Sequence, residues 1–267
     1  MMCFKRKKTI AITSPYVFLG FGINDYFGDA NDLRGCINDI NDEINKLGYE
    51  FPEFQCLKHL DSRVTTHFFM SEIRRVYKEM DALCKKTGQR GFLYIKYSGH
   101  GTQVPSSSEP NNYNEALYLY NGVLIDDNIY KLQQETPDTI DVLAKFDSCF
   151  SGDIGSRDLF GNPTYRKARF MPLEGVPILH VPKNRLAKTD SGQKWIIFSA
   201  GGEEQTVADA TFNGRPNGAF TYADLNSYSR GSLYDKELEL TRLFLAANKF
   251  DHVPELSGPH EGKTMPK

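Results

Sequence analysis

The 267-residue sequence has no long apolar run, no excess of charge of one sign and no CxxC pair of cysteines. A membrane-spanning helix needs about 20 consecutive apolar residues, so no membrane association is expected. The formal net charge is −2 with both signs interspersed, which gives no electrostatic reason to expect nucleic acid as a partner. The five scattered cysteines argue against a disulfide framework or a structural zinc site, and they predict a reducing, cytoplasmic location. The six histidines also lack the spacing of zinc ligands, which disfavours a zinc hydrolase.

Apolar runs that suit buried strands alternate with segments of helical periodicity along the chain. We expect a single α/β domain with a mostly parallel central sheet and helices on both faces. The predicted strands are 16–23, 54–60, a run ending at 98, a run ending near 147, and 195–200. The predicted helices are 33–47, 62–88, 127–134, 219–227 and 234–248. Asp61 or Ser62 is the expected cap of the second helix, and Ser232 of the last.

The pattern fades between residues 154 and 194, where four prolines and many basic residues predict a long loop. We therefore divide the domain into a first part at about 10–153, a linker at about 154–194 and a last part at about 195–257. Residues 102–116 and 201–220 are also expected to be loops. The tail after His252 is expected to be irregular.

Two predicted strands each deliver one reactive side chain at their carboxyl end. FLYIKYSGHG ends in His100, and VLAKFDSCFSGD ends in Cys149. Ligands bind at this edge of open parallel sheets, so a thiol and an imidazole placed there predict a cysteine nucleophile and its base. The backbone N–H groups of Gly101 and Cys149 could together form an oxyanion hole. Taken singly, a buried cysteine and a histidine are more often ordinary packing residues.

Further motifs identify a resemblance to a known family. SGHG at 98–101 and DSCFSG at 147–152 resemble the histidine and cysteine motifs of caspase-like peptidases, and the interval of 49 residues between His100 and Cys149 agrees with this. RGCIND at 34–39, SAGGEEQTVADA at 199–210, GAFTYA at 218–223 and HVPELS at 252–257 extend the resemblance to metacaspases, over residues 17 to 257. The resemblance implies a caspase-like fold and a cysteine endopeptidase that cuts after Arg or Lys, acting on protein or peptide substrates.

The resemblance also implies which residues would bind the basic side chain of the substrate. By similarity, Asp39, Asp147, Ser98 and Cys36 would line the S1 pocket, and two carboxylates suit a guanidinium or an ammonium group. The residues themselves give a second reason, because Phe150 and Ser151 follow the cysteine where caspases carry residues for an acidic substrate. Without the motif match, an ordinary exposed carboxylate in an acidic helix is the favoured interpretation of Asp39.

Calcium activation is a further implication of the resemblance. The acids Asp126 and Asp127 match positions that help to bind calcium in metacaspases, although such a pair before a short helix is usually an N-cap with a first-turn acid. Asn114 stands where the family has an aspartate, and the acid expected beyond the Ser-Gly turn is out of register. Calcium activation and a calcium-independent enzyme both remain open.

The basic residues of the 154–194 linker suggest self-cleavage by an enzyme of basic specificity. The alternative to a peptidase is a catalytically silent, caspase-fold interaction module, because intact motifs do not prove activity. A Rossmann-type nucleotide enzyme is disfavoured because GFGIND does not complete a GxGxxG turn. The family resemblance implies a monomer.

Overall fold

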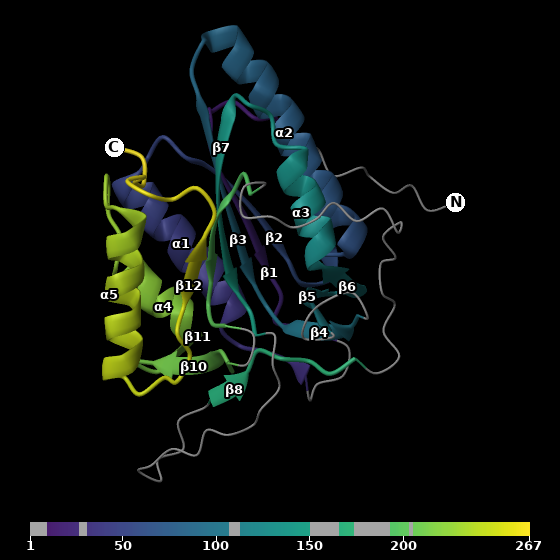
Figure 1. The fold of residues 1–267 in the computed structure, drawn as a ribbon, viewed down its shortest axis with the longest axis vertical. Coiled ribbons are helices and arrows are strands. Elements are labelled where there is room, and N and C mark those ends of the chain that lie inside the picture. The colour runs from purple at the N-terminus through teal and green to yellow at the C-terminus, as the bar shows by residue number, and fades with distance from the viewer. Residues whose placement is uncertain (1–9, 27–30, 107–112, 150–165, 174–192, 203–204) are drawn as a thin grey trace.

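A computed structural model gives the structure of residues 10–26, 31–106, 113–149, 166–173, 193–202 and 205–267 (Figure 1). The strands are β1 (Tyr16–Gly22), β2 (Gln55–Leu60), β3 (Gly91–Ser98), β4 (Gly101–Pro105), β5 (Tyr113–Leu119), β6 (Gly122–Ile125), β7 (Ile140–Asp147), β8 (Arg166–Ala168), β9 (Ile196–Ser199), β10 (Ala208–Phe212), β11 (Arg215–Gly218) and β12 (Glu255–Ser257). The helices are α1 (Cys36–Glu50), a 3₁₀ turn η2 (Asp61–Arg63), α2 (Thr66–Thr87), α3 (Asp126–Gln134), α4 (Ala219–Leu225) and α5 (Tyr234–Ala247).

A six-stranded sheet forms the centre, in the order β12-β9-β7-β3-β1-β2. Every neighbouring pair in it is parallel except β12 with β9. Helices α1, α4 and α5 cover one face and α2 and α3 cover the other (Figure 1). The predicted architecture, a mostly parallel sheet between two layers of helices, is confirmed.

The central strands lie inside the molecule because their sequences are apolar on both faces. Six of the seven residues of β1 are buried, as are seven of the eight residues in each of β3 and β7. This is the pattern of parallel strands that helices cover on both sides. The strands of the sheet therefore end at a common, well-defined edge.

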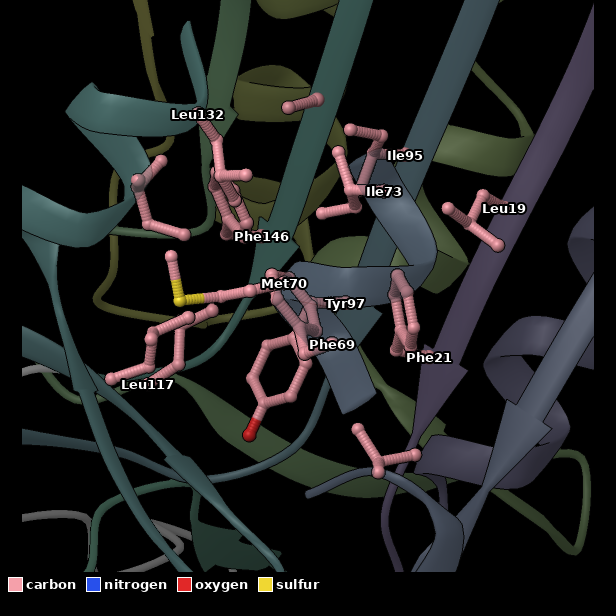
Figure 2. Close-up of a cluster of buried hydrophobic side chains, with 14 of the residues drawn as sticks. Leu19, Phe21, Phe69, Met70, Ile73, Ile95, Tyr97, Leu117, Leu132 and Phe146 are labelled. Atoms are coloured by element: carbon pink, nitrogen blue, oxygen red, sulfur yellow. The ribbon is translucent and has the colours of Figure 1, made fainter. Parts of the chain in front are cut away.

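Two hydrophobic clusters fill the space between the sheet and its two helical layers. One lies under α2, where Phe69, Met70 and Ile73 pack over Leu19 and Ile95 of the sheet (Figure 2). The other lies on the opposite face and includes residues of α1, α4 and α5. Burying an apolar side chain of this size contributes about 1.5–3 kcal/mol, so these clusters are the main source of stability.

A buried ion-pair cluster fixes β7 to the last helices of the chain. Lys145 on β7 lies 2.8 Å from Asp224 of α4 and also pairs with Glu237 of α5, and all three side chains are fully buried. Burial alone would lower the pKa of Lys145, but the neighbouring carboxylates raise it. Truncating one partner of such a group typically costs about 3–5 kcal/mol. The cluster therefore holds the strand that leads to Cys149.

Three segments that the sequence predicts to be loops contain strands instead. Residues 102–116 contribute to a β4-β5-β6 sheet, and 201–220 contain the β10–β11 hairpin, which pairs with β8. The tail after His252 adds β12 to the edge of the central sheet. The prediction of loops was wrong because polar, glycine-rich sequence does not exclude strands. The backbone hydrogen bonds that form these strands come from partner segments, several of them distant in the sequence.

Both predicted helix caps were also wrong. Thr65 caps α2, with its hydroxyl accepting a hydrogen bond of 3.2 Å from the Phe68 N–H, because Asp61 and Ser62 form the preceding 3₁₀ turn. Helix α5 begins after Leu233 without a side-chain cap. In the part of the chain that the structure describes, no helix combines the length and apolar character that a membrane crossing requires. The division of the domain at residues 154 and 194 remains a prediction.

Candidate active site

The ends of β3 and β7 lie side by side at the carboxyl edge of the sheet. Ser98 pairs with Asp147 in the parallel register, and the Gly99 N–H donates to the Asp147 carbonyl at 3.3 Å. His100 and Cys149 each follow two residues after these paired positions, and each side chain is buried. The two residues that the sequence singled out are thus delivered to the same edge.

The orientation of His100 is fixed by backbone and aromatic contacts. Its Nε2 lies 2.7 Å from the Asn31 carbonyl oxygen, and the Tyr26 ring lies 4.6 Å from the imidazole, centroid to centroid. Because a carbonyl oxygen only accepts, Nε2 carries the proton and the neutral ring keeps a lone pair on Nδ1. Burial lowers the pKa of His100 to about 4, so the ring is neutral near pH 7 and can accept a proton.

The Cys149 thiol points toward a carbonyl of the loop after β9. Its Sγ donates to the Gln205 carbonyl oxygen at 3.0 Å. The backbone N–H of Cys149 donates at 3.2 Å to the carbonyl oxygen of Arg169, and the N–H of Gly101 donates to the same oxygen at 2.8 Å. A carbonyl held by two backbone N–H groups, one from the residue of a thiol nucleophile, is the arrangement of an oxyanion hole.

Residues 166–173 run along this edge of the sheet like a bound peptide. The β8 strand pairs antiparallel with β10, and the Arg169 N–H donates to the Val207 carbonyl at 3.0 Å. Phe170 then bridges Gly101 in parallel. The residues before Arg169 therefore pair with β10, and Phe170 after it pairs with the start of β4. The carbonyl of Arg169 lies between these two pairings, at the pair of N–H donors.

The Arg169 side chain is completely buried in a pocket of acids. Its Nη2 lies 2.7 Å from Asp39 Oδ2 and 2.9 Å from Asp209 Oδ1. Its Nη1 lies 3.0 Å from Asp147 Oδ1 and donates to Ser98 Oγ at 2.7 Å. Burial alone would lower the pKa of Arg169, but the three carboxylates hold it well above its usual value. The pocket thus matches both the charge and the planar shape of a guanidinium.

The acids of this pocket are held by backbone and side-chain donors. Asp39, in the first turn of α1, accepts from the Gly218 N–H at 2.9 Å. Asp147 accepts from the Thr221 N–H at 3.0 Å. Asp209 accepts from the Arg34 N–H at 2.9 Å and from the Gly35 N–H. Donors fixed in this way keep the carboxylates in place without a cation of their own.

The four residues predicted for S1 occupy different places around Arg169. Asp39, Asp147 and Ser98 contact the guanidinium directly, and Asp39 is fully buried rather than an exposed helix carboxylate. Cys36 lies beside them, where burial raises the pKa of its thiol and Arg169 acts in the opposite direction. The structure thus brings all four together.

Sequence reasoning missed three participants. Asp209 belongs to the SAGGEEQTVADA motif, but the sequence predicts a loop there, and a loop gives no expected direction for its side chain. The Asn31 carbonyl is a backbone group and leaves no residue-type signal. Arg169 was one of several linker basic residues, and nothing in the sequence distinguished it from the others.

The candidate calcium ligands lie apart from this site. Asp126 and Asp127 form the first turn of α3, after Ile125 as N-cap, and Asn114 is on β5. Among the described residues, no group of three or more histidine, cysteine or acidic side chains is arranged to hold a metal ion. The further acids Asp153 and Asp158 lie outside the described residues. Calcium takes about six to eight oxygen ligands, more than the side chains of Asp126, Asp127 and Asn114 supply, and this geometry tests neither calcium activation nor a calcium-independent enzyme.

The metacaspase peptidase C14 domain matches residues 18–156, slightly more than half of the chain. The chain belongs to the metacaspase family. Metacaspase-1 of Coccidioides immitis is 26% identical over 90% of this chain and 60% of its own length. Metacaspase-1 of Kluyveromyces lactis is 27% identical over 97% and 67%. The chain therefore spans about two thirds or less of the length of these curated relatives.

Two solved structures support the same fold. A Geobacter sulfurreducens protein superposes with a TM-score of 0.63 and 20% identity over 91% of this chain and 94% of that one. Caspase-1 of Spodoptera frugiperda superposes with a TM-score of 0.58 and 11% identity over 97% and 93%. At these identities the likeness concerns the fold alone.

Proposed function

We propose that this metacaspase-family chain is a cysteine endopeptidase that cleaves after arginine or lysine, with Cys149 as nucleophile and His100 as base. The observation that carries the proposal is the position of Arg169. Its carbonyl oxygen accepts from two backbone N–H groups, one of them that of Cys149, while its side chain fills an acidic pocket. A chain segment in this arrangement is held as a substrate with arginine at P1, the residue before the cleaved bond.

The proposed reaction begins when the thiol turns from the Gln205 carbonyl toward the carbonyl carbon of P1. The Sγ proton passes to Nδ1 of His100 and the Sγ–C bond forms, while the Gly101 and Cys149 N–H groups stabilise the oxyanion. The C–N bond then breaks, and His100 gives its proton to the leaving amine. Water attacks the thioester carbon while His100 takes one of its protons, and the C–S bond then breaks to release the carboxylic acid product. His100 returns its proton to Sγ, which restores the free thiol.

The same position supports self-processing, with the bond between Arg169 and Phe170 as its site. The sequence predicts self-cleavage somewhere in the 154–194 linker, and Arg169 is the member of that linker whose side chain fills the pocket. Arg157, Lys183, Arg185 and Lys188 lie outside the described residues. Holding the bond in the same chain replaces a bimolecular encounter by an intramolecular one, which favours this site over external substrates.

Peptide cleavage tests the proposal against the silent-module alternative. Purified protein is assayed on fluorogenic peptides with Arg, Lys or Asp at P1, with added calcium and with chelator, beside the Cys149→Ala variant. Cleavage of the Arg and Lys peptides by the unmodified chain alone supports the peptidase. Absence of cleavage under every condition, from a chain that is folded by circular dichroism, would favour an interaction module. The comparison with chelator also distinguishes calcium activation from a calcium-independent enzyme.

A further inference from the structure

The segment that continues past Arg169 is held as closely as the segment that precedes it. The Met171 N–H donates to the Gly101 carbonyl oxygen at 3.0 Å, and the Gly101 N–H donates to the Arg169 carbonyl oxygen. One residue therefore binds the chain on both sides of the bond between Arg169 and Phe170. These two hydrogen bonds place the backbone of Met171, the second residue after the Arg169–Phe170 bond, against Gly101.

The side chain at that second position is buried, whereas its successor is not. Met171 is 4% exposed and belongs to the hydrophobic cluster under α2. Leu173 packs against the same cluster, and Pro172 between them is exposed. Phe170 is half-buried and packs against the other cluster, which contains Cys149. The alternation of sides is that of an extended peptide.

Met171 belongs to an apolar cluster that also includes residues of β4 and β5. Gly101, which binds its backbone, pairs on its other side with Leu117 of β5, and Leu117 belongs to the same cluster (Figure 2). Val104 of β4 belongs to it as well. A charged side chain placed there would lose its hydration without gaining an opposite charge from these neighbours.

We propose that the position of the Met171 side chain is an S2′ subsite. It selects substrates with an apolar side chain, unbranched like methionine or branched like leucine, two positions after the cleaved bond. The proposal rests on the proposed peptidase function and adds a requirement on the far side of the bond. The subsite has two parts, the apolar pocket that Met171 fills and the Gly101 carbonyl that takes the backbone N–H. Proline at P2′ fits neither the hydrogen bond nor the register, because it has no N–H.

For an external substrate to use the subsite, residues 170–173 must leave it after self-cleavage. The test therefore uses self-processed wild-type protein and quenched fluorescent peptides that copy residues 166–173, Arg-Lys-Ala-Arg-Phe-Met-Pro-Leu. The P2′ methionine is replaced by leucine, aspartate, proline or N-methyl-methionine. In a control peptide the exposed P3′ proline is replaced by alanine. The quantity measured is kcat/KM for cleavage after the P1 arginine.

Methionine and leucine peptides are expected to be cleaved at similar rates. Aspartate is expected to lower kcat/KM about 10- to 100-fold, from loss of apolar burial. N-methylation leaves the methionine side chain intact and removes one hydrogen bond, so a loss of about three- to tenfold is expected. Proline is expected to lose the hydrogen bond and the register, so its kcat/KM should fall at least as far as that of the N-methyl peptide. The P3′ control is expected to match the parent peptide.

Self-processing supplies a second test in the intact chain. Met171→Asp is expected to slow cleavage after Arg169 at least tenfold, while Pro172→Asp at the exposed neighbouring position leaves its rate unchanged. Each variant is also made with Cys149→Ala to compare thermal unfolding, because Met171 is part of the core. Peptides all cleaved at one rate whatever stands at P2′ would overturn the subsite and leave the peptidase standing. If no P1 arginine peptide is cleaved, both proposals fall.

Discussion

Arg169 contacts Asp147 twice, through Nη1 at 3.0 Å from Oδ1 and through a hydrogen bond of 3.1 Å from Nη1 to the backbone carbonyl. Asp147 ends β7 two residues before Cys149. A guanidinium bound in the pocket therefore holds the end of the strand that carries the nucleophile. Under the proposed function, recognition of the P1 side chain and placement of the thiol are coupled through Asp147.

Removing either member of the proposed dyad should impair cleavage, each for a different chemical reason. Cys149→Ala removes the nucleophile, so no product above background is expected. His100→Ala leaves the thiol without its base and should lower kcat about 10²- to 10⁴-fold. Both rates are measured with a P1 arginine peptide. A His100→Ala rate within threefold of wild type would contradict the assigned role of His100.

The third carboxylate of the pocket should set the preference for arginine. Asp39 and Asp209 bind Nη2 while Asp147 binds Nη1, and the single nitrogen of a lysine ammonium cannot occupy both positions. Asp209→Asn should lower kcat/KM for arginine peptides about 10- to 100-fold and for lysine peptides less, chiefly through KM. An equal loss for both peptides would show that Asp209 contributes negative charge to the pocket without favouring a guanidinium over an ammonium.

A methyl group added to Gly218 should block the pocket. An alanine Cβ there would lie 2.6 Å from the Arg169 Nη1 atom and would also meet the Asp147 carboxylate. Gly218→Ala is expected to lower kcat/KM for P1 arginine peptides at least 100-fold. Gly48→Ala in α1 is the matched control, since nothing lies within 4 Å of the added Cβ, and its activity should be unchanged. Full activity of Gly218→Ala would contradict the location of S1.

Two buried histidines should make the folded state sensitive to acid. Burial lowers the pKa of His100 to about 4, and burial together with the Arg169 charge lowers the pKa of His252 to about 4. Both pKa values lie below that of an unfolded histidine, near 6.5, so the unfolded state binds protons first as the pH falls. The free energy of unfolding should drop by about 2 kcal/mol per histidine between pH 7.5 and 5.

Denaturant unfolding of Cys149→Ala protein across that pH range measures the effect. His252→Gln should remove about half of the pH dependence. A free energy of unfolding that stays constant from pH 7.5 to 5 would show that the two rings are not buried as neutral groups.

The sequence predicted the fold and the two strand ends because both depend on local pattern. The buried runs ending at Ser98 and Asp147 have the composition of central parallel strands, and parallel strands must end at one edge. His100 and Cys149 follow directly from this. Asp39 came from the resemblance of its motif, since nothing in the pattern of an acidic helix shows which carboxylate is buried.

The remainder of the site depends on pairing between distant segments. The β10–β11 hairpin turns at Asn213-Gly214, both with positive φ, and this dipeptide is the usual signal of a two-residue hairpin turn. Recognising it would have placed Asp209 on a strand. That Arg169 is the residue held in the pocket depends on β8 pairing with β10, and single-sequence patterns do not determine such register.

The position of self-cleavage tests the account most directly. The wild-type chain and Cys149→Ala are incubated side by side, and the new termini are identified by intact-mass and peptide mass spectrometry, with Arg169→Ala as a further control. The account predicts a fragment that ends at Arg169 and another that begins at Phe170, from the wild-type chain only. Cleavage first at another basic residue, or the same fragments from Cys149→Ala, would contradict it.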